Sequence, residues 1–198
     1  MNKKFHGKFI LLVVPSRDFE WIEYQVVKQA LDDAGCEVFT TSDNSIEAVA
    51  KTGESVSIDG AISIIDVSKY DGVFFIGGPG TMSCLNTPQA YRLVKDAREM
   101  GLIYGAIDLA VRVLAYADGL VGIAATGLNT DKELEEILMT HGARYRKTHE
   151  NKKPDVIVDN NVITAQGPAE AHGFAQAILK LLDDKEKGIV QHPLPKRW

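Results

Sequence analysis

Residues 101–115 read GLIYGAIDLAVRVLA, and this stretch decides the fold. It begins as a short apolar strand, reaches one polar residue at Asp108, and continues at once as an apolar helix. A strand that turns directly into a helix must bend sharply at the junction, as it does at a nucleophile elbow. The free N–H groups and the positive dipole end of the helix point at the same place. We therefore expect Asp108 to lie where negative charge is favoured.

A second interpretation of Asp108 is a plain helix N-cap. Asp is among the residues preferred at that position, because its side chain accepts hydrogen bonds from the first free N–H groups of the helix. Spacing alone favours the cap. One aspartate can serve both purposes, so the sequence leaves both interpretations open.

Apolar runs suited to buried strands alternate along the chain with segments of helical spacing, which predicts an α/β fold with a mostly parallel sheet. Besides the strand before Asp108, the expected strands are residues 9–14, 36–41, 73–76, 123–126, 144–148, 156–158 and 162–165, and the other expected helices are 20–34, 87–100, 131–139 and 169–182. Ser16 or Asp18 is expected to cap the first helix. Residues 130–133 fit a capping box, and residues 56–64 suggest a hairpin.

Three predicted turns meet at one edge of this sheet. They are residues 15–23, residues 77–80 and the junction at Asp108, and all follow the carboxyl ends of strands, where ligands of such sheets bind. The turn at 77–80 reads Gly-Gly-Pro-Gly and lacks the spacing of a dinucleotide-binding fingerprint. We therefore expect a small-molecule site without a bound cofactor.

Composition narrows the function classes. The chain has 198 residues, which fits one domain, and a net charge of -5, which argues against a nucleic-acid partner. No apolar run approaches the roughly 20 residues that a membrane helix needs, and the start carries no signal peptide, so we expect a cytoplasmic protein. Its two cysteines, Cys36 and Cys84, provide no metal-ligand spacing and no disulfide framework. No metal is expected.

Several segments in matching order resemble the ThiJ/PfpI superfamily. They are residues 19–23, 70–78, 106–108, 114–115, 124–126, 161–168, 174–175 and 184–194. The resemblance implies a flavodoxin-like three-layer sandwich of the class I glutamine amidotransferase-like type, and a homodimer. It also implies one domain over residues 1–183, followed by a C-terminal tail over 184–198 that packs on the domain. The tail is similar to that of the parkinsonism-associated stress-protein branch.

The sequence departs from this family at the elbow. The family carries a cysteine where this chain has Asp108, and a histidine where it has Gly127, so both members of the expected Cys–His pair are missing. The residues after the elbow also differ, with Leu109-Ala110 in place of His-Gly or Ala-Gly. Thiolate chemistry cannot be transferred to a carboxylate. Because several positions differ together, natural divergence is favoured over one engineered change.

The resemblance also places a helix-one glutamate against the elbow. The best match is Glu23, and Glu20 is the second. Two neighbouring carboxyl groups do not ionise together easily, so Glu23 is expected to hold a proton and donate it to Asp108. The alternative is that Glu23 points away and that Arg112, one helical turn after Asp108, pairs with the aspartate instead.

The remaining candidate residues surround this pair. By the resemblance, the backbone N–H groups of Gly78 and Leu109 match the family's oxyanion-hole donors. Gly77 belongs to the same turn, which any sharp strand exit needs. The other expected pocket residues are Thr126, Gly127, Arg112, Glu20 and His172. His172 is either near the pocket rim or an ordinary surface histidine.

Two functions follow from these expectations. The first is a non-thiol binding, sensing or chaperone-like stress protein, homodimeric, with a small carbonyl or anionic ligand. Asp108 would then stand permanently where the family has an oxidised cysteine. The second is a hydrolase or lyase, peptidase-, amidase- or glyoxalase-like, that uses Glu23 and Asp108 as general acid and base.

Overall fold

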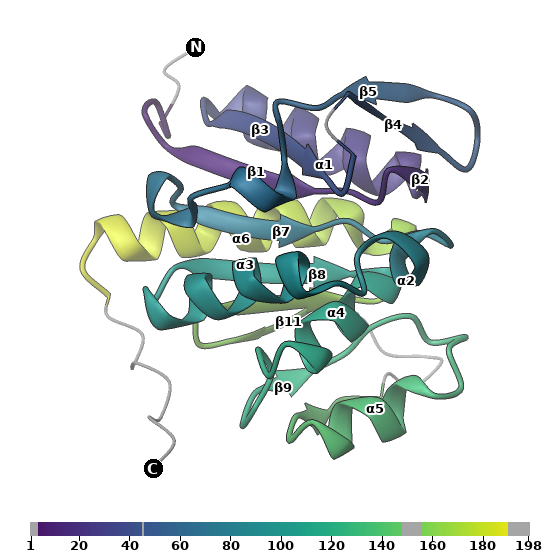
Figure 1. Ribbon diagram of the computed structural model, residues 1–198. Coiled ribbons are helices and arrows are strands. Elements are labelled where there is room, and N and C mark those ends of the chain that lie inside the picture. The colour runs from purple at the N-terminus through teal and green to yellow at the C-terminus, as the bar shows by residue number, and fades with distance from the viewer. Residues whose placement is uncertain (1–3, 45, 148–155, 190–198) are drawn as a thin grey trace.

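The computed structural model describes residues 4–44, 46–147 and 156–189, and a seven-stranded sheet runs through its centre (Figure 1). The strand order is β11-β12-β8-β7-β1-β3-β6. These strands are β1 (Phe9–Val13), β3 (Glu37–Ser42), β6 (Gly60–Ala61), β7 (Gly72–Phe75), β8 (Ile103–Ile107), β11 (Val156–Asp159) and β12 (Val162–Ala165). All neighbours are parallel except the pair β11 and β12. The predicted mostly parallel sheet is confirmed.

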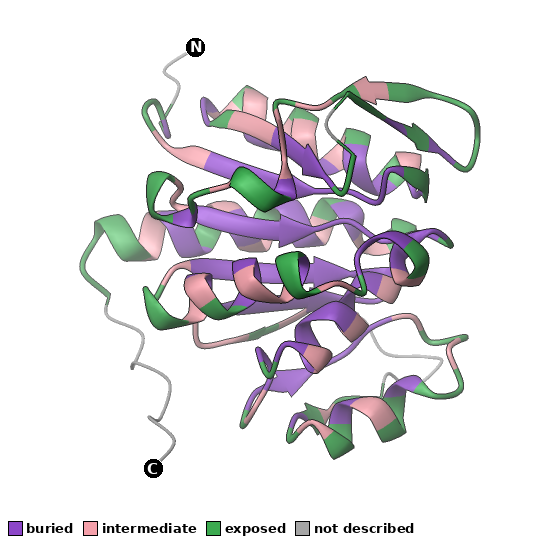
Figure 2. Ribbon diagram, in the orientation of Figure 1, coloured by how far each residue is buried: buried purple, intermediate pink, exposed green. Residues whose placement is uncertain are grey.

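Helices cover both faces of the sheet, which makes three layers (Figure 1). On one face lie α1 (Trp21–Ala34) and α6 (Ala171–Glu186), which pack against each other. On the other face lie α3 (Pro88–Glu99) and α4 (Val111–Tyr116). Figure 2 shows the central strands β7 and β8 buried and the outer surfaces of the helices exposed. The flavodoxin-like sandwich that the resemblance implied is confirmed.

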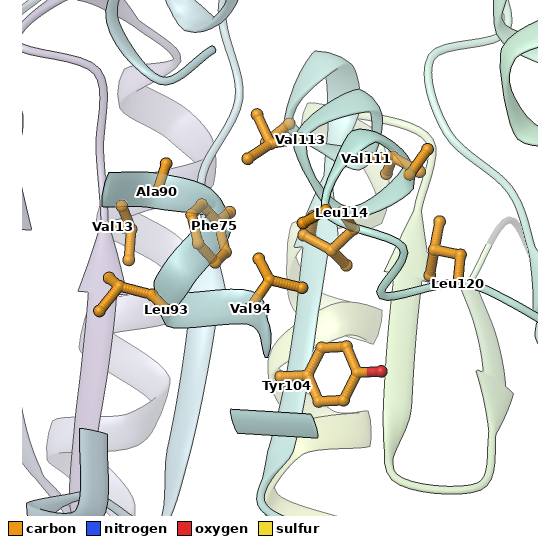
Figure 3. Packing of buried hydrophobic residues seen from close by; sticks show 14 of the residues in the cluster. Val13, Phe75, Ala90, Leu93, Val94, Tyr104, Val111, Val113, Leu114 and Leu120 are labelled. Carbon is orange, nitrogen blue, oxygen red and sulfur yellow. The ribbon is translucent and has the colours of Figure 1, made fainter. Parts of the chain in front are cut away.

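Alternate side chains of each central strand enter the two different cores. Ile10 and Leu12 of β1 pack in the cluster with α1 and α6, whereas Leu11 and Val13 pack in the cluster with α3 and α4. Figure 3 shows Val13 close to Leu93 of α3 in the second cluster. Because both faces of the strand are covered, its sequence is continuously apolar rather than alternating.

The central strand β8 fits a crowded position. A Cβ atom on Gly105 would lie 2.2 Å from the backbone oxygen of Ile163 on β12, so only glycine allows these strands to approach this closely. Its neighbour Tyr104 is buried, but the hydroxyl donates a 2.6 Å hydrogen bond to the backbone oxygen of Gly119 (Figure 3). The strand therefore enters the elbow fixed by packing on both sides.

Residues 56–64 do not form the predicted hairpin. Residues Ser55–Ser57 (β5) pair antiparallel with Glu47–Ala50 (β4), which pairs in turn with Arg17–Phe19 (β2), while β6 joins the main sheet beside β3. Asp59 lies between these two attachments. Its carboxylate accepts a 2.7 Å hydrogen bond from the Thr40 backbone N–H. This contact holds the turn against β3. It joins residues that are 19 positions apart, so a pattern of neighbouring residues does not predict it.

The predicted helix caps are also wrong at two helices. The N-cap of α1 is Glu20 and has no side-chain cap bond, because the Ser16 hydroxyl donates to Asp43 instead. The helix α5 (Leu134–Thr140) begins three residues later than predicted and also lacks a side-chain cap. The acid of that predicted capping box, Glu133, instead accepts a 3.1 Å bond from Arg112. In both places a longer-range bond takes the capping side chain.

The C-terminal helix continues beyond the boundary at residue 183, since α6 ends at Glu186. The tail residues 190–198 lie outside the described residues, so the division into domain and tail stays a prediction. The remaining short elements are η1 (Ile62–Ile64), η2 (Val67–Lys69), α2 (Thr81–Cys84), η3 (Asp108–Ala110), β9 (Ala124–Ala125), β10 (Arg144–Tyr145) and η4 (Pro168–Glu170). No helix in the described part of the chain is both long and apolar enough to cross a membrane.

Candidate functional site

The sharp bend expected at Asp108 is confirmed. Asp108 follows β8 directly, has a backbone φ of 62°, and starts η3, which leads into α4. This left-handed conformation is uncommon outside glycine, and Asp and Asn are enriched among the exceptions. The side chain is buried and accepts a 2.8 Å hydrogen bond from the Gly78 backbone N–H, and the N-cap positions of η3 and α4 are Ile107 and Ala110. The interpretation as a plain N-cap is therefore wrong.

The three predicted turns do meet at this point. The N–H of Gly77 donates to Glu23 Oε2 at 3.0 Å, and the next N–H, that of Gly78, donates to Asp108 Oδ2 at 2.8 Å. The backbone of Glu20 binds the Gly77 oxygen at 2.9 Å. A Cβ atom on Gly77 would lie 2.6 Å from Asp108 Oδ2. Two consecutive backbone donors thus hold two carboxyl groups, and the close approach requires glycine.

Glu23 comes from the first turn of α1 and is fully buried. Its Oε2 accepts the bond from Gly77, but its Oε1 has no hydrogen-bond partner among the described residues. Burial first, and the neighbouring Asp108 charge second, raise the pKa of Glu23 well above its ordinary value. A raised pKa was expected here, and its causes are the expected ones.

The expected direct hydrogen bond from Glu23 to Asp108 is not formed in the described structure. Each carboxyl group is bound to its own backbone N–H, and Glu23 Oε1 is left without a partner. Two adjacent backbone donors, Gly77 and Gly78, hold the two groups, one each. The carboxyls interact by charge instead, without a shared hydrogen bond.

The backbone donors expected to form an oxyanion hole serve Asp108 itself. Burial raises the pKa of Asp108, while the backbone N–H groups of Leu109 and Gly78 oppose that rise by binding its charged form. The Asp108 carboxylate therefore lies on the donors that a reacting oxyanion would use. In this chain the hole is filled by the protein's own side chain.

Lys51 is a site residue that the sequence did not reveal. Its ammonium group forms an ion pair with Glu20, whose side chain is 8% exposed, while the Lys51 side chain is 43% exposed. The Lys51 charge also offsets part of the rise in the pKa of Glu23 and of Asp108. Residue 51 follows β4, which packs beside β2 through long-range strand pairing, and no local pattern in the sequence connects it to the elbow.

Arg112 does not pair with Asp108, so that alternative is wrong. Its guanidinium binds the Asp131 carboxylate with both ends, including a 2.6 Å bond from Nε, and reaches Glu133 at 3.1 Å. These partners raise the pKa of Arg112. Arg112 thus fixes the segment before α5 and leaves the elbow carboxyls without an arginine.

Gly127 lies where the family's histidine was expected, and its surroundings are crowded. A Cβ atom there would lie 2.8 Å from Leu134 Cδ2 and 3.1 Å from Val111 Cβ. A larger side chain would therefore require Leu134 of α5 and the first residue of α4 to shift.

The last two predicted pocket residues differ in their surroundings. Thr126 is fully buried, its N–H donates to Thr164 Oγ1 at 3.0 Å, and its hydroxyl accepts a 3.4 Å bond from Gln166. His172 is exposed near the start of α6, and none of the described hydrogen bonds or ion pairs involves it. The structure therefore supports a place for Thr126 among the polar residues at the carboxyl edge of the sheet and supports an ordinary surface position for His172.

Within the described ranges, no group of His, Cys, Asp and Glu is placed to hold a metal ion.

Comparison with known proteins identifies the family. A sequence profile of the DJ-1/PfpI family matches residues 8–181. The chain belongs to the DJ-1/PfpI family. Among curated relatives of this DJ-1/PfpI protein, the glutathione-independent glyoxalase DJR-1.2 of Caenorhabditis elegans is 29% identical over 180 residues, covering 91% of each chain. An uncharacterised protein of Methanocaldococcus jannaschii is 29% identical over 175 residues, covering 88% of this chain and 82% of the other.

Solved structures agree with the DJ-1/PfpI assignment. A ThiJ/PfpI domain protein from Brachyspira murdochii superposes with a TM-score of 0.81 at 27% identity, covering 90% of this chain and 99% of the other. The resemblance to the ThiJ/PfpI superfamily is therefore confirmed over nearly the whole chain.

Proposed function

We propose that this chain is a DJ-1/PfpI-fold binding protein that lacks the family's thiol-dependent activity and holds a small ligand at an acidic elbow. The observation that carries the proposal is the position of the Asp108 carboxylate. It accepts the Gly78 N–H at 2.8 Å, so the donor for a reacting oxyanion is already used. A carboxylate there is a poorer nucleophile than a thiolate.

The surroundings of Gly127 support the same proposal. Cysteine proteases and related enzymes need a base within hydrogen-bonding reach of the nucleophile. Leu134 and Val111 fill the space that such a base would need at this position. Restoring cysteine alone at 108 would therefore not rebuild a Cys–His pair.

The occupied donors also bear on the ligand class. An anionic ligand would have to displace the Asp108 carboxylate from Gly78, and it would meet the neighbouring carboxyls of Glu20 and Glu23. A neutral carbonyl group needs no such displacement. Of the two ligand classes expected from the sequence, the site geometry disfavours the anionic one.

In a family whose elbow carries a cysteine, Asp108 resembles the oxidised, negatively charged form of that residue. A permanent acid at the elbow would hold the protein in one state, independent of oxidant. We extend the proposal to a sensing or chaperone-like stress protein that acts as a homodimer in the cytoplasm, as the resemblance implies.

A second candidate function is acid–base catalysis by Glu23 and Asp108. The observation that favours it is the raised pKa of a buried Glu23 beside a second carboxyl, an arrangement found in general acids. The wild-type protein would then turn over substrate without any cysteine at the elbow.

Turnover assays on wild type and Asp108→Cys separate the two functions. Methylglyoxal and a peptide amide are incubated with each protein, and product is measured against a buffer blank. The binding proposal expects wild type to match the blank. Saturable wild-type turnover that disappears in Asp108→Asn would reject it and support acid–base catalysis. Thr126→Ser, which keeps the hydroxyl at the same edge, serves as the matched folding control.

A further inference from the structure

The carboxyl groups of the elbow outnumber the cations that act on them. Glu20, Glu23 and Asp108 lie within electrostatic reach of one another, and the positive charge that acts on both buried acids is Lys51. The Lys51 ammonium is bound to Glu20. Glu23 and Asp108 therefore have backbone donors but no cation of their own. A buried cluster with excess negative charge is costly and gains from any added positive charge.

One atom in this cluster has no bonding partner. Glu23 Oε1 belongs to a fully buried side chain and makes no hydrogen bond within the described structure. Leaving a buried polar atom unpaired is unfavourable, and buried side-chain oxygens in native proteins almost always have a partner. The neighbouring donors cannot supply one, because the N–H of Gly77 binds Oε2 and that of Gly78 binds Asp108. The described residues thus supply no donor to Oε1.

We infer that this cluster binds a primary ammonium group, either the ammonium ion or a small alkylammonium, between Glu23 and Asp108. The inference rests on the proposed binding function and names its ligand class. An ammonium group brings several N–H donors, of which one can reach Glu23 Oε1 and another Asp108. It also brings the positive charge that the cluster lacks.

Other ligand classes satisfy fewer of these conditions. A carbonyl group can accept a bond from protonated Glu23, but it leaves the Asp108 charge without compensation. An anion adds repulsion. A metal ion has no suitable group of side chains in the described residues.

Burial and the nearby Asp108 carboxylate raise the pKa of Glu23 and so favour its protonated form when no ligand is bound. Binding of the ammonium group therefore ionises Glu23 and releases that proton to the buffer, so that one positive charge replaces another. The charged groups that act on Glu23 in this exchange are Asp108, Glu20 and Lys51.

Lys51 competes with the ligand in this site. It is itself an ammonium group on a flexible stem, bound at the neighbouring carboxyl, and its side chain is 43% exposed. Its positive charge partly neutralises the cluster and lowers the pKa of both buried acids. Removing that charge should strengthen ligand binding, whereas removing the Glu23 charge should weaken it. A purely structural role of either residue would not produce opposite effects.

Calorimetric titration of the full chain with ammonium chloride and methylammonium chloride tests the inference. Sodium chloride at equal ionic strength and tetramethylammonium chloride, which has no N–H donor, are the matched probes. Wild type should bind both primary ammonium probes saturably, and neither control. Titration in two buffers of different ionisation enthalpy should show release of one proton.

Glu23→Gln should lose about tenfold or more in affinity, as expected for a hydrogen bond to a charged group. Lys51→Met should gain severalfold, and the surface variant Glu47→Gln should match wild type.

Two results would overturn the inference. One is the absence of saturable ammonium binding in both wild type and Lys51→Met. The other is equal affinity in wild type and Glu23→Gln, with circular dichroism showing both proteins folded. The dicarbonyl and amide assays report separately on the proposed function. Turnover by wild type would reject the binding function, while failure to bind ammonium with no turnover would reject the ligand class alone.

Discussion

Two aspartates near helix α4 are stabilised in opposite ways. Asp131 is half-buried, with a side chain that is 6% exposed, and it is bound by both ends of the Arg112 guanidinium. Asp108, which precedes α4, is buried, but within the described structure it is bound by the backbone N–H of Gly78 and by no arginine or lysine. The first carboxylate has a full opposite charge, and the second has only backbone dipoles.

The difference separates a structural acid from a functional one. The Arg112–Asp131 pair joins α4 to the segment before α5, and its charges cancel. The elbow places Asp108 beside Glu23, whose pKa rises because the Gly77 hydrogen bond and the Lys51 charge only partly offset burial and the Asp108 charge. Perturbed carboxyl groups of this kind gather at functional sites, where folds accept a loss of stability. The comparison therefore agrees with the proposed binding role on the Asp108 side of α4 and with a stabilising role on the Asp131 side.

The largest expected effect comes from breaking the compensated pair. Arg112→Ala leaves Asp131 as an unpaired carboxylate in a site where it is 6% exposed, and so makes it resemble Asp108. Removing one partner of a buried ion pair typically costs about 3–5 kcal/mol, and we expect about 3 kcal/mol here because Asp131 can gain some water. Urea unfolding followed by circular dichroism measures the change.

The control for this variant is Lys28→Ala. Lys28 pairs with Asp32 on the surface of α1, with side chains 35% and 40% exposed. Exposed pairs of this spacing contribute about 0.3–0.5 kcal/mol. If Arg112→Ala costs no more than Lys28→Ala, the contrast between the two aspartates does not hold.

A smaller effect is expected from placing a base beside the elbow. Gly127→His introduces a Cβ atom 2.8 Å from Leu134 Cδ2 and 3.1 Å from Val111 Cβ. Overpacking of this kind costs about 1–3 kcal/mol, so the variant should unfold at lower urea concentration. Gly167→Ala is the matched control, since a Cβ there has no heavy atom within 4 Å, and it should change stability by less than about 0.5 kcal/mol. A Gly127→His protein as stable as wild type would show that the position accepts a side chain.

Much of the site could be predicted from local sequence patterns. The strand-to-helix junction at Asp108 has no loop residues, and the alternation of strands and helices puts the turns at 15–23 and 77–80 on the same sheet edge. Both inferences need only the period of the apolar residues and the direction of parallel strands. Glu23 as the partner acid followed from the family resemblance.

What could not be predicted depends on contacts between distant residues. Lys51 reaches Glu20 because β4 pairs with β2, and neither short strand has a recognisable pattern. The side-by-side arrangement of Glu23 and Asp108 depends on which backbone N–H each one binds. Local sequence patterns indicate where strands and helices lie. They do not indicate which of several nearby N–H groups a carboxylate binds, so the hydrogen-bond partners of Glu23 and Asp108 could not be predicted from them.

The pH dependence of the free energy of unfolding tests the part of the comparison that concerns Asp108 and its neighbour Glu23. The pKa of Glu23 is raised in the folded protein, mainly by burial and then by Asp108. The folded state therefore binds this proton more tightly than the unfolded chain, and its contribution to stability is complete below the unfolded pKa. It is lost as pH rises through the raised folded value, which is opposite to a salt-bridged carboxylate.

Glu23→Gln keeps a donor and an acceptor but cannot titrate, so it should flatten this fall in stability. Urea unfolding of wild type and variant across pH 5 to 8 measures the slope, in the range that lies above the ordinary value for Glu of about 4.3. Asp108→Asn should flatten it partly, since the Asp108 charge is the second cause of the raised pKa. Glu47→Gln, on the exposed face of β4, should leave the slope unchanged. A Glu23→Gln protein with the wild-type slope would show that Glu23 is already ionised.

The smallest effect is expected in the peroxide oxidation of the two cysteines. This experiment compares the wild-type protein, which has a carboxylate at the elbow, with a variant that has a thiol there. Cysteine oxidation follows thiolate content and exposure. Burial raises the pKa of Cys36 to about 11, and Cys84 is buried with its sulfur 3.5 Å from the Ser16 hydroxyl oxygen. At sub-stoichiometric peroxide, mass spectrometry of the wild-type protein should therefore show no dominant sulfinic product on either residue.

Asp108→Cys is the matched positive control for this experiment. Its thiol would lie at the start of η3, within reach of the Gly78 N–H that now binds the Asp108 carboxylate, and such donors stabilise a thiolate. The variant should therefore oxidise selectively at residue 108 under conditions that leave Cys36 and Cys84 unchanged. A dominant sulfinic product on Cys84 in wild type would instead place the reactive centre beside Ser16. Asp108 would then have no part in the chemistry, and the contrast between the two aspartates would be one of stability alone.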